Sequence, residues 1–239
     1  MQIPDTRGAR SVILGALRAS APETPLPLPE LRAYLDGPHG RGSVGPRVAP
    51  STLAAPFETA ARSWRADVLH AGASDWPQAV RQALDRRGCQ RVVIGAASPL
   101  QPELDAALAS LQLRRFDQPL EQWKGELFDA VDASVTATAG GIADTGTLVL
   151  RPGTDEPRTL SLVPAVHVAV LRVSALYASL PVALRALAPP GDLPSNLLLI
   201  SGPSKTADIQ QVLAYGAHGP KELVIVLVHD VDTQEGSLP

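Results

Sequence analysis

The order of apolar runs along residues 52–229 constrains the fold of this 239-residue chain more than any other feature. Short apolar runs such as "RVVIGA" (91–96) and "ELVIVLVHD" (222–230) have the length and the flanking residues of buried strands. Between several of them lie stretches with helical periodicity, including "DWPQAVRQALDRRG" (75–88), which ends at Gly88. Strands that alternate with helices in this way predict an α/β fold, in which helices flank a mixed, mostly parallel sheet.

The same periodicities give the expected elements. Helices are expected at 52–65, 75–88, 102–111, 120–130, 181–188 and 207–216, and strands at 66–72, 91–96, 133–140, 160–172, 196–200 and 222–230. The run "NLLLI" (196–200) is expected to be a buried central strand. The stretch "SVTATAGGIADTGTLVL" (134–150) has the pattern strand, glycine-rich turn, strand, without an intervening helix. It therefore predicts an antiparallel hairpin inserted in the sheet.

The first 50 residues differ from the rest. Asp5 can cap an amphipathic helix that places Val12, Ile13 and Leu17 on one face. Residues 21–50 then contain seven prolines with glycines between them, and proline removes amide donors and fixes φ. We therefore divide the chain into an N-terminal helix with a Pro/Gly-rich arm (1–50) and an α/β domain (51–239).

Composition narrows the classes of partner. The net charge of −3, the 4% aromatic content and the lack of a long basic cluster make nucleic acid a poor candidate. The single cysteine, Cys89, can form no internal disulfide and cannot supply the four thiolates that an iron–sulfur cluster typically needs. No two histidines have the spacing of a zinc site, and the dinucleotide-binding and nucleophile-elbow motifs are absent. We expect no metal, no bound cofactor, no membrane insertion and a cytoplasmic location.

The junction "ISGPSKTADIQ" (200–210) is the first candidate site. If a helix begins after Ser204, its free amides carry partial positive charge and Lys205 adds a full one. Gly202 lets the backbone approach a ligand closely. We predict that a small anion binds at Ser201, Gly202, Ser204, Lys205 and Thr206. The alternative is that Ser204 or Thr206 only caps the helix.

Two further loops are rich in polar residues. In "GGIADTGTLVL" (140–150), Asp144 can act as a general base, and Gly141, Thr145, Gly146 and Thr147 can contact a ligand. The alternative there is a plain turn, in which Asp144 bonds local amides. In "YGAHGPKEL" (215–223), His218 and Gly219 can contact an anion, or the imidazole can cap backbone carbonyls. His167 lies within an apolar strand. It is a second candidate for proton transfer beside Asp144, and the alternative is a hydrogen-bonded histidine of the core.

Four stretches in this order, "GIADTGTLVL", "SLVPAVHVAVL", "ISGPSKTADI" and "GAHGPKEL", resemble the LUD domain family, and within it the lactate-utilisation protein C group. The resemblance covers about residues 130–229. It implies a fold similar to those of ribose-5-phosphate isomerases, CoA transferases and formyltetrahydrofolate cyclo-ligases. It also implies a part in a bacterial three-protein system that oxidises L-lactate to pyruvate, with cysteine-rich iron–sulfur proteins as partners.

The chain departs from the pattern of that family at two positions. Asp144 stands where the family usually has Glu. Lys205 stands where the family often has Arg, and lysine lacks the bidentate geometry of arginine toward an anion. The resemblance leaves open whether the protein is itself an enzyme. Two alternatives remain: a stand-alone enzyme acting on a phosphorylated sugar, a CoA ester or a folate, and a non-catalytic regulatory subunit of the same system.

Overall fold

The computed structural model describes residues 7–20, 48–187, 194–207, 213–215 and 219–231. The chain divides into two units, Met1–Ser43 and Val44–Pro239. In the first unit, α1 (Arg7–Ala19) is the amphipathic helix expected from the sequence. Asp5 and the Pro/Gly-rich arm up to residue 47 lie outside the described residues.

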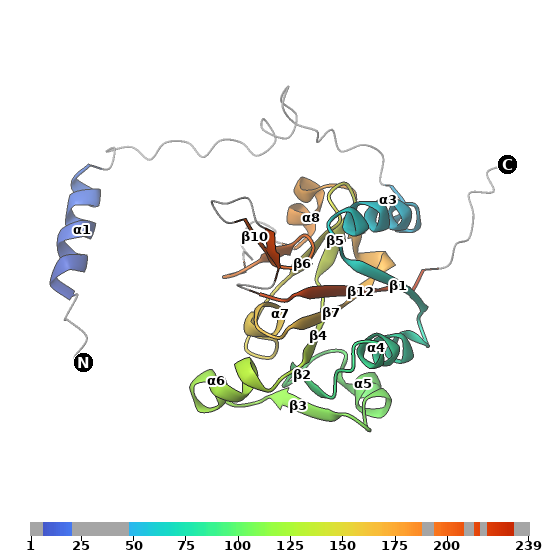
Figure 1. Ribbon diagram of the computed structural model, residues 1–239. Coiled ribbons are helices and arrows are strands. Elements are labelled where there is room, and N and C mark those ends of the chain that lie inside the picture. The colour runs from blue at the N-terminus through green and yellow to red at the C-terminus, as the bar shows by residue number, and fades with distance from the viewer. Residues whose placement is uncertain (1–6, 21–47, 188–193, 208–212, 216–218, 232–239) are drawn as a thin grey trace. The chain divides into compact units, whose positions relative to one another are not determined.

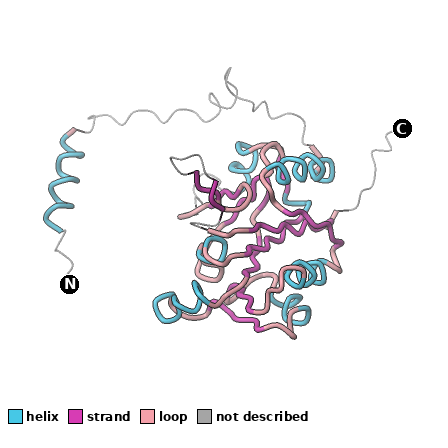
Figure 2. Tube along the Cα trace, in the orientation of Figure 1, coloured by secondary structure: helices cyan, strands magenta, loops and turns pink. Residues whose placement is uncertain are grey.

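A six-stranded sheet forms the centre of the second unit (Figures 1 and 2). Every neighbouring pair in it is parallel, which confirms the predicted α/β fold with a mostly parallel sheet. The edge strand β3 was not expected from the sequence. In spatial order the strands are β1 (Asp67–Gly72), β12 (Glu222–His229), β7 (Val166–Arg172), β4 (Ala133–Ala137), β2 (Arg91–Gly95) and β3 (Gln112–Phe116).

The sheet is wound in two directions from its middle. The chain passes from β2 outward to β3 and returns to β4, which lies on the other side of β2. From β4 it continues the opposite way, through β7 to β12, and β1 is added at that far edge. The neighbours β2 and β4 therefore form the point at which the winding direction reverses, where open α/β sheets have a crevice at the carboxyl ends of their strands.

Helices and a second sheet cover the two faces. The helices are α3 (Pro50–Ser63), α4 (Trp76–Asp85), α5 (Gln101–Ala107), α6 (Leu120–Asp129), α7 (Thr159–Leu162) and α8 (Leu180–Leu187), with one 3₁₀ turn at Val173–Ala175. Residues 160–162, which the sequence assigned to the start of the strand that contains His167, belong to the short helix α7 instead. Pro164 lies between α7 and β7, and it is a residue that cannot continue a helix.

Alternate residues of the central strands enter different cores, as the two-residue period of a strand requires. In β12, Val224, Val226 and Val228 pack with α4 and α5. Leu223, Ile225 and Leu227 pack with α3 and the second sheet. Both sets are almost fully buried, which is why this strand is a continuous apolar run in the sequence.

The second sheet corrects two expectations. Its strands are β8 (Leu176–Tyr177), β5 (Gly140–Ile142), β6 (Thr147–Leu150) and β9 (Leu198–Ile200). The predicted hairpin exists, but it joins β5 to β6 and lies in this sheet rather than in the main one. The run at 196–200 is not a buried central strand. It forms β9, an edge strand paired antiparallel with β6, and Leu199 is 49% exposed.

Gly146 lies at the contact between the β5–β6 hairpin and α3. Its φ is +63°, and a Cβ there would lie 2.2 Å from the backbone nitrogen of Ala61. The close approach of the hairpin to the helix thus requires a residue without a side chain.

We expect Gly146→Ala to lower the free energy of unfolding by about 2–4 kcal/mol, because it combines a strained φ with a backbone clash. Gly125→Ala in α6 is the control, since its Cβ would meet nothing within 4 Å. Alanine in a helix interior should raise stability by about 0.5–1 kcal/mol. Urea unfolding of both variants tests this, and equal effects would contradict the packing described for Gly146.

Candidate functional site

The most unusual buried polar side chain is His167, the second residue of β7. It is 0% exposed, and it points into the same core as Ala169 and Leu171. Its Nε2 lies 2.8 Å from the hydroxyl oxygen of Thr136 on the neighbouring strand β4. Its Nδ1 has no hydrogen-bond partner among the residues that the structure describes. A buried polar atom without a partner costs about 1–3 kcal/mol, so it calls for an explanation.

A cavity of about 240 Å³ adjoins His167. Leu223 of β12 lies beside His167 in its floor, and Ser161 and Leu162 of α7 form one wall. The chain that follows β9, together with Gly219 and Pro220, forms the remaining walls. The cavity is large enough for a small metabolite and too small for most cofactors.

Specific contacts fix the walls of this cavity. The N–H of Ser204 donates to the carbonyl of Pro220 at 2.9 Å, which ties the two wall segments together. The hydroxyls of Ser201 and Thr147 lie 2.7 Å apart, so the wall is also tied to the second sheet. Gly202 has a φ of +82°, and a Cβ there would lie 2.2 Å from the carbonyl oxygen of Trp64. The cavity is therefore built by residues distant in sequence.

Five of the residues that the sequence proposed for the site line this cavity: His167, Ser201, Gly202, Ser204 and Gly219. Thr147 is connected to the cavity by the hydrogen bond between its hydroxyl and that of the wall residue Ser201. The hydroxyl of Thr147 also donates to the hydroxyl of Thr145. Lys205 is exposed, directly after Ser204. His218 lies outside the described residues, as does the side chain of Thr206.

The remaining proposed residues lie elsewhere. Asp144 is exposed in the β5–β6 turn, where its N–H donates to the carbonyl of Ala178 at 3.2 Å. Thr145 is exposed in the same turn. Gly141 is buried in β5, where a Cβ would crowd Leu171 and Phe57. Gly141 therefore serves packing in this structure, as Gly146 does.

The prediction of a helix at 207–216 is wrong for those of its residues that the structure describes. Lys205–Ala207 form β10, which pairs antiparallel with β11 (Leu213–Tyr215). Residues 208–212 and 216–218 lie outside the described residues. Thr206 and Tyr215 are of residue types that favour strands, and pairing between the two segments overrides the helical period. The free helix amides on which the anion site was argued are thus absent from the described part of this loop.

The location of the loop also differs from expectation. Residues 201–204 follow a strand of the second sheet and so do not lie at the carboxyl edge of the parallel sheet. The cavity lies near the amino ends of β7 and β12, since His167 and Leu223 are each the second residue of their strand. The sequence missed Ser161 and Leu162 as walls, because α7 was not expected.

A second hollow adjoins the first and shares Pro203 and Leu223 with it. It has a volume of about 240 Å³, and Lys221, Arg65 and Arg87 line it. Arg87 is held by Asp67 at 2.8 Å and by Glu222 at 2.7 Å. Lys221 is exposed and follows Pro220 directly, so it brings positive charge beside the His167 cavity.

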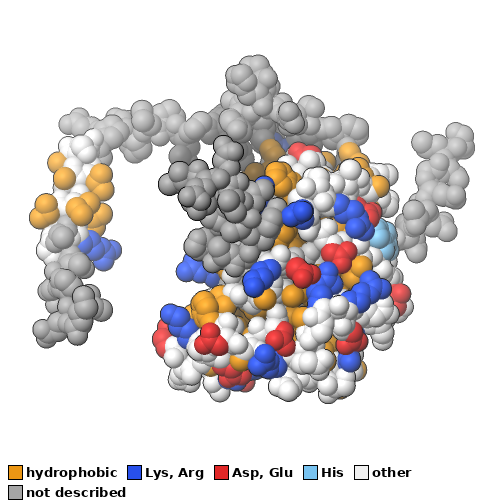
Figure 3. All heavy atoms as spheres, viewed as in Figure 1, with side chains coloured by type: hydrophobic (Ala, Val, Ile, Leu, Met, Phe, Trp, Pro, Cys, Tyr) orange, Lys and Arg blue, Asp and Glu red, His pale blue; other side chains and the backbone are white. Residues whose placement is uncertain are grey.

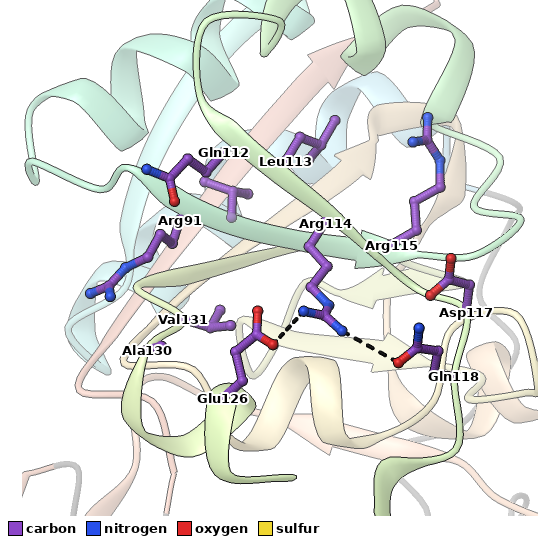
Figure 4. Close-up of a pocket in the computed structure, with 11 residues that line it drawn as sticks. Arg91, Gln112, Leu113, Arg114, Arg115, Asp117, Gln118, Glu126, Ala130 and Val131 are labelled. Carbon is purple, nitrogen blue, oxygen red and sulfur yellow. Dashed lines mark hydrogen bonds and ion pairs between the residues drawn. The ribbon is translucent and has the colours of Figure 1, made fainter. Parts of the chain in front are cut away.

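Another hollow, of about 500 Å³, lies at β3 and α6 (Figure 4). Its arginines already have partners: Arg114 lies between Glu126 and Gln118, and Arg91 and Arg115 pair with Asp132 and Asp105. Basic and acidic side chains are likewise interspersed over the face seen in Figure 3. Exposed pairs of this kind are ordinary surface features, and they do not mark a site.

Other reactive groups give no site in the described part of the chain. No three of its His, Cys, Asp or Glu residues are grouped so that they could hold a metal ion. Cys89 is buried, and burial raises the pKa of its thiol to about 11. Such a thiol stays protonated and unreactive near neutral pH. Among the described helices, none has the length and apolar character needed to span a bilayer.

Burial lowers the pKa of His167 to about 4 from 6.5. In the unfolded chain His167 therefore binds a proton below about pH 6.5, whereas in the folded chain it does so only below about pH 4. The resulting stabilisation is complete above pH 6.5, and roughly 3 kcal/mol of it is lost as the pH falls to 4. We expect His167→Gln to remove this part of the pH dependence. Urea unfolding of both proteins across this range tests it, and identical slopes would show that His167 is not neutral and buried.

The comparisons with known proteins agree on one family. The LUD domain model matches residues 54–228. An uncharacterized protein of Neisseria meningitidis is 40% identical over 72% of this chain and 75% of its own length. A "Lactate utilization protein C" of Deinococcus radiodurans is 32% identical over 72% of this chain and 77% of its own. The crystal structure of a DUF162 family protein from Deinococcus radiodurans has a TM-score of 0.58 at 25% identity, covering 76% of this chain and 99% of that one. The chain belongs to the LUD domain family.

Proposed function

We propose that this protein takes part in the utilisation of L-lactate, as one component of a bacterial three-protein system that oxidises L-lactate to pyruvate. Relatives that carry the name lactate utilization protein C support the process. The observation that supports a direct part in it is the cavity at His167. This space of small-metabolite size is lined by a buried imidazole whose Nδ1 has no hydrogen-bond partner among the described residues.

A small 2-hydroxy acid suits this cavity. Its hydroxyl can hydrogen-bond to Nδ1 of His167, because a neutral imidazole can donate or accept at that atom according to its tautomer. Hydroxyl groups of Ser161, Ser201 and Ser204 surround the rest of the space. The carboxylate gains its charge partner from Lys205 or Lys221, which follow the wall residues Ser204 and Pro220 in the chain.

Between the two proposed proton-transfer groups, the geometry favours His167 over Asp144. His167 lines the cavity, whereas Asp144 lies in an exposed turn and does not line it. A neutral imidazole can take the hydroxyl proton of a bound 2-hydroxy acid. Asp144 lies beside Thr145, from which hydrogen bonds lead through Thr147 to Ser201 in the cavity wall.

Oxidation of L-lactate to pyruvate releases two electrons and two protons, so the proposed system needs an electron acceptor. The single cysteine of the whole chain cannot hold an iron–sulfur cluster. We therefore assign the electrons to cysteine-rich iron–sulfur proteins as partners, and ligand binding and proton transfer to this chain. In this division of labour the protein needs no cofactor of its own.

Complementation of a deletion strain tests the proposal. With L-lactate as the only carbon source, we expect His167→Gln to reduce L-lactate oxidation by at least about 10-fold, as loss of a general base does. His70→Gln, at an exposed histidine outside the cavity, should complement fully. Immunoblotting must show equal amounts of both variants.

Three outcomes separate the alternatives. Normal growth of the deletion strain, in a host without another route for lactate, would refute a role in lactate utilisation. Full complementation by His167→Gln would instead indicate a regulatory subunit whose cavity takes no part in the reaction. Stabilisation of the purified protein by a sugar phosphate, a CoA ester or a folate, but not by L-lactate or pyruvate, would indicate the stand-alone enzyme.

A further inference from the structure

The crevice where the sheet reverses its winding is occupied by the chain itself. Pairing between β2 and β4 ends at Val93–Ser134, before Gly95 and Ala137 complete the two strands. The loop 151–158, which follows β6, enters at this point. The N–H of Ala96 donates to the carbonyl of Asp155 at 2.9 Å, so the loop continues the hydrogen bonding that β4 no longer offers to β2.

The side chain of Glu156 fills the position where open α/β sheets bind ligands. Its carboxylate accepts the N–H of Ala137, at 3.2 Å to Oε2, and the hydroxyl of Ser98. Ser98 is 5% exposed, and it lies in the segment that follows β2. A hydroxyl and a strand-end amide that converge on one carboxylate are the donors that a carboxylate-bearing ligand would use.

Two further observations show how closely the loop fits. A Cβ on Gly95 would lie 2.3 Å from the carbonyl oxygen of Asp155 and 2.5 Å from Cγ of Glu156, so the loop can take this position only over a glycine. The space left beside Glu156 is about 20 Å³, enough for one water molecule at most. Burial raises the pKa of Glu156 against the lowering effect of its bonds with Ser98 and Ala137. Desolvation thus works against the carboxylate in this position.

We propose that the carboxyl ends of β2 and β4 form a binding site for a small carboxylate, which Glu156 occupies as an internal substitute and which a ligand opens by displacing the loop 151–158. The ligand carboxylate takes the hydrogen bonds of Ser98 and the Ala137 amide, and Glu156 moves into solvent. These two donors do not line the His167 cavity, so this site does not depend on the proposed function.

Chemical rescue of Glu156→Ala tests the site. The variant leaves both donors in place and removes their carboxylate, so added acetate should bind and raise Tm by a few degrees in a saturable way. Asp155→Ala is the matched control, because it removes a neighbouring exposed carboxylate and leaves Glu156 in place. The control and the wild type should respond only at higher acetate concentrations, because acetate must first displace Glu156 in them. Sodium chloride holds the ionic strength constant.

Sodium phosphate forms a second arm, and it distinguishes a site for carboxylates from a general anion site. A saturable rise with acetate and none with phosphate supports the proposal as stated. A rise with both widens the ligand class to small anions. An equal response of Glu156→Ala and Asp155→Ala to acetate would overturn the proposal.

Glu156→Gln keeps the shape of the side chain, and it is the second test variant if Glu156→Ala does not fold. Its neutral amide is a weaker acceptor, so the loop should be displaced more easily. In hydrogen-exchange measurements, acetate should speed exchange of the amides of residues 153–156 and protect the amide of Ala137. Unchanged exchange at both places would overturn the proposal by an independent route.

Discussion

The double-sided burial of the central strands is the constraint on which the rest of the structure depends. Because β7 and β12 are covered on both faces, each of their side chains is assigned to one core or the other by its place in the strand. Apolar residues meet this requirement almost throughout. His167 is the exception, and burial holds it neutral. Its Nε2 is bonded to Thr136, and its Nδ1 has no hydrogen-bond partner among the described residues.

The sequence predicted the fold well where burial alone decides it. The runs that became β2, β7 and β12 are apolar because they are buried on both faces, and that pattern is local. Prediction from the sequence failed where pairing between distant segments determines the structure. "NLLLI" looks like a central strand, but β6 holds it at the edge of a second sheet, and the apparent helix after Lys205 begins and ends in paired extended segments. The edge strand β3 was missed because its residues, among them Arg114 and Arg115, are only half-buried and so lack an apolar run.

The sequence pointed to some of the residues that line the cavity but not to its geometry. Polar and glycine residues in the loops drew attention to Ser201, Gly202, Ser204 and Gly219, and these do meet at one cavity together with His167. The predicted anion site depended on the partial positive charge of a helix end after Ser204, and the described residues do not contain that helix end. Glu156 and Ser98 carried no signal in the sequence, because a single Glu in a loop becomes notable only when the ends of β2 and β4 are seen around it. Thr136 connects the two places: it bonds His167 and also lines the small space beside Glu156.

The central claim is that the free Nδ1 of His167 faces a ligand rather than being merely unsatisfied. Histidine-selective ¹⁵N NMR during a titration with L-lactate measures this directly, because the shift of a ring nitrogen reports its hydrogen bond. The account predicts that one imidazole, absent from the spectrum of His167→Gln, shifts at Nδ1 in a saturable way and keeps its Nε2 signal. A His167 resonance that stays unchanged at saturating L-lactate and pyruvate, while the protein remains folded, would contradict it.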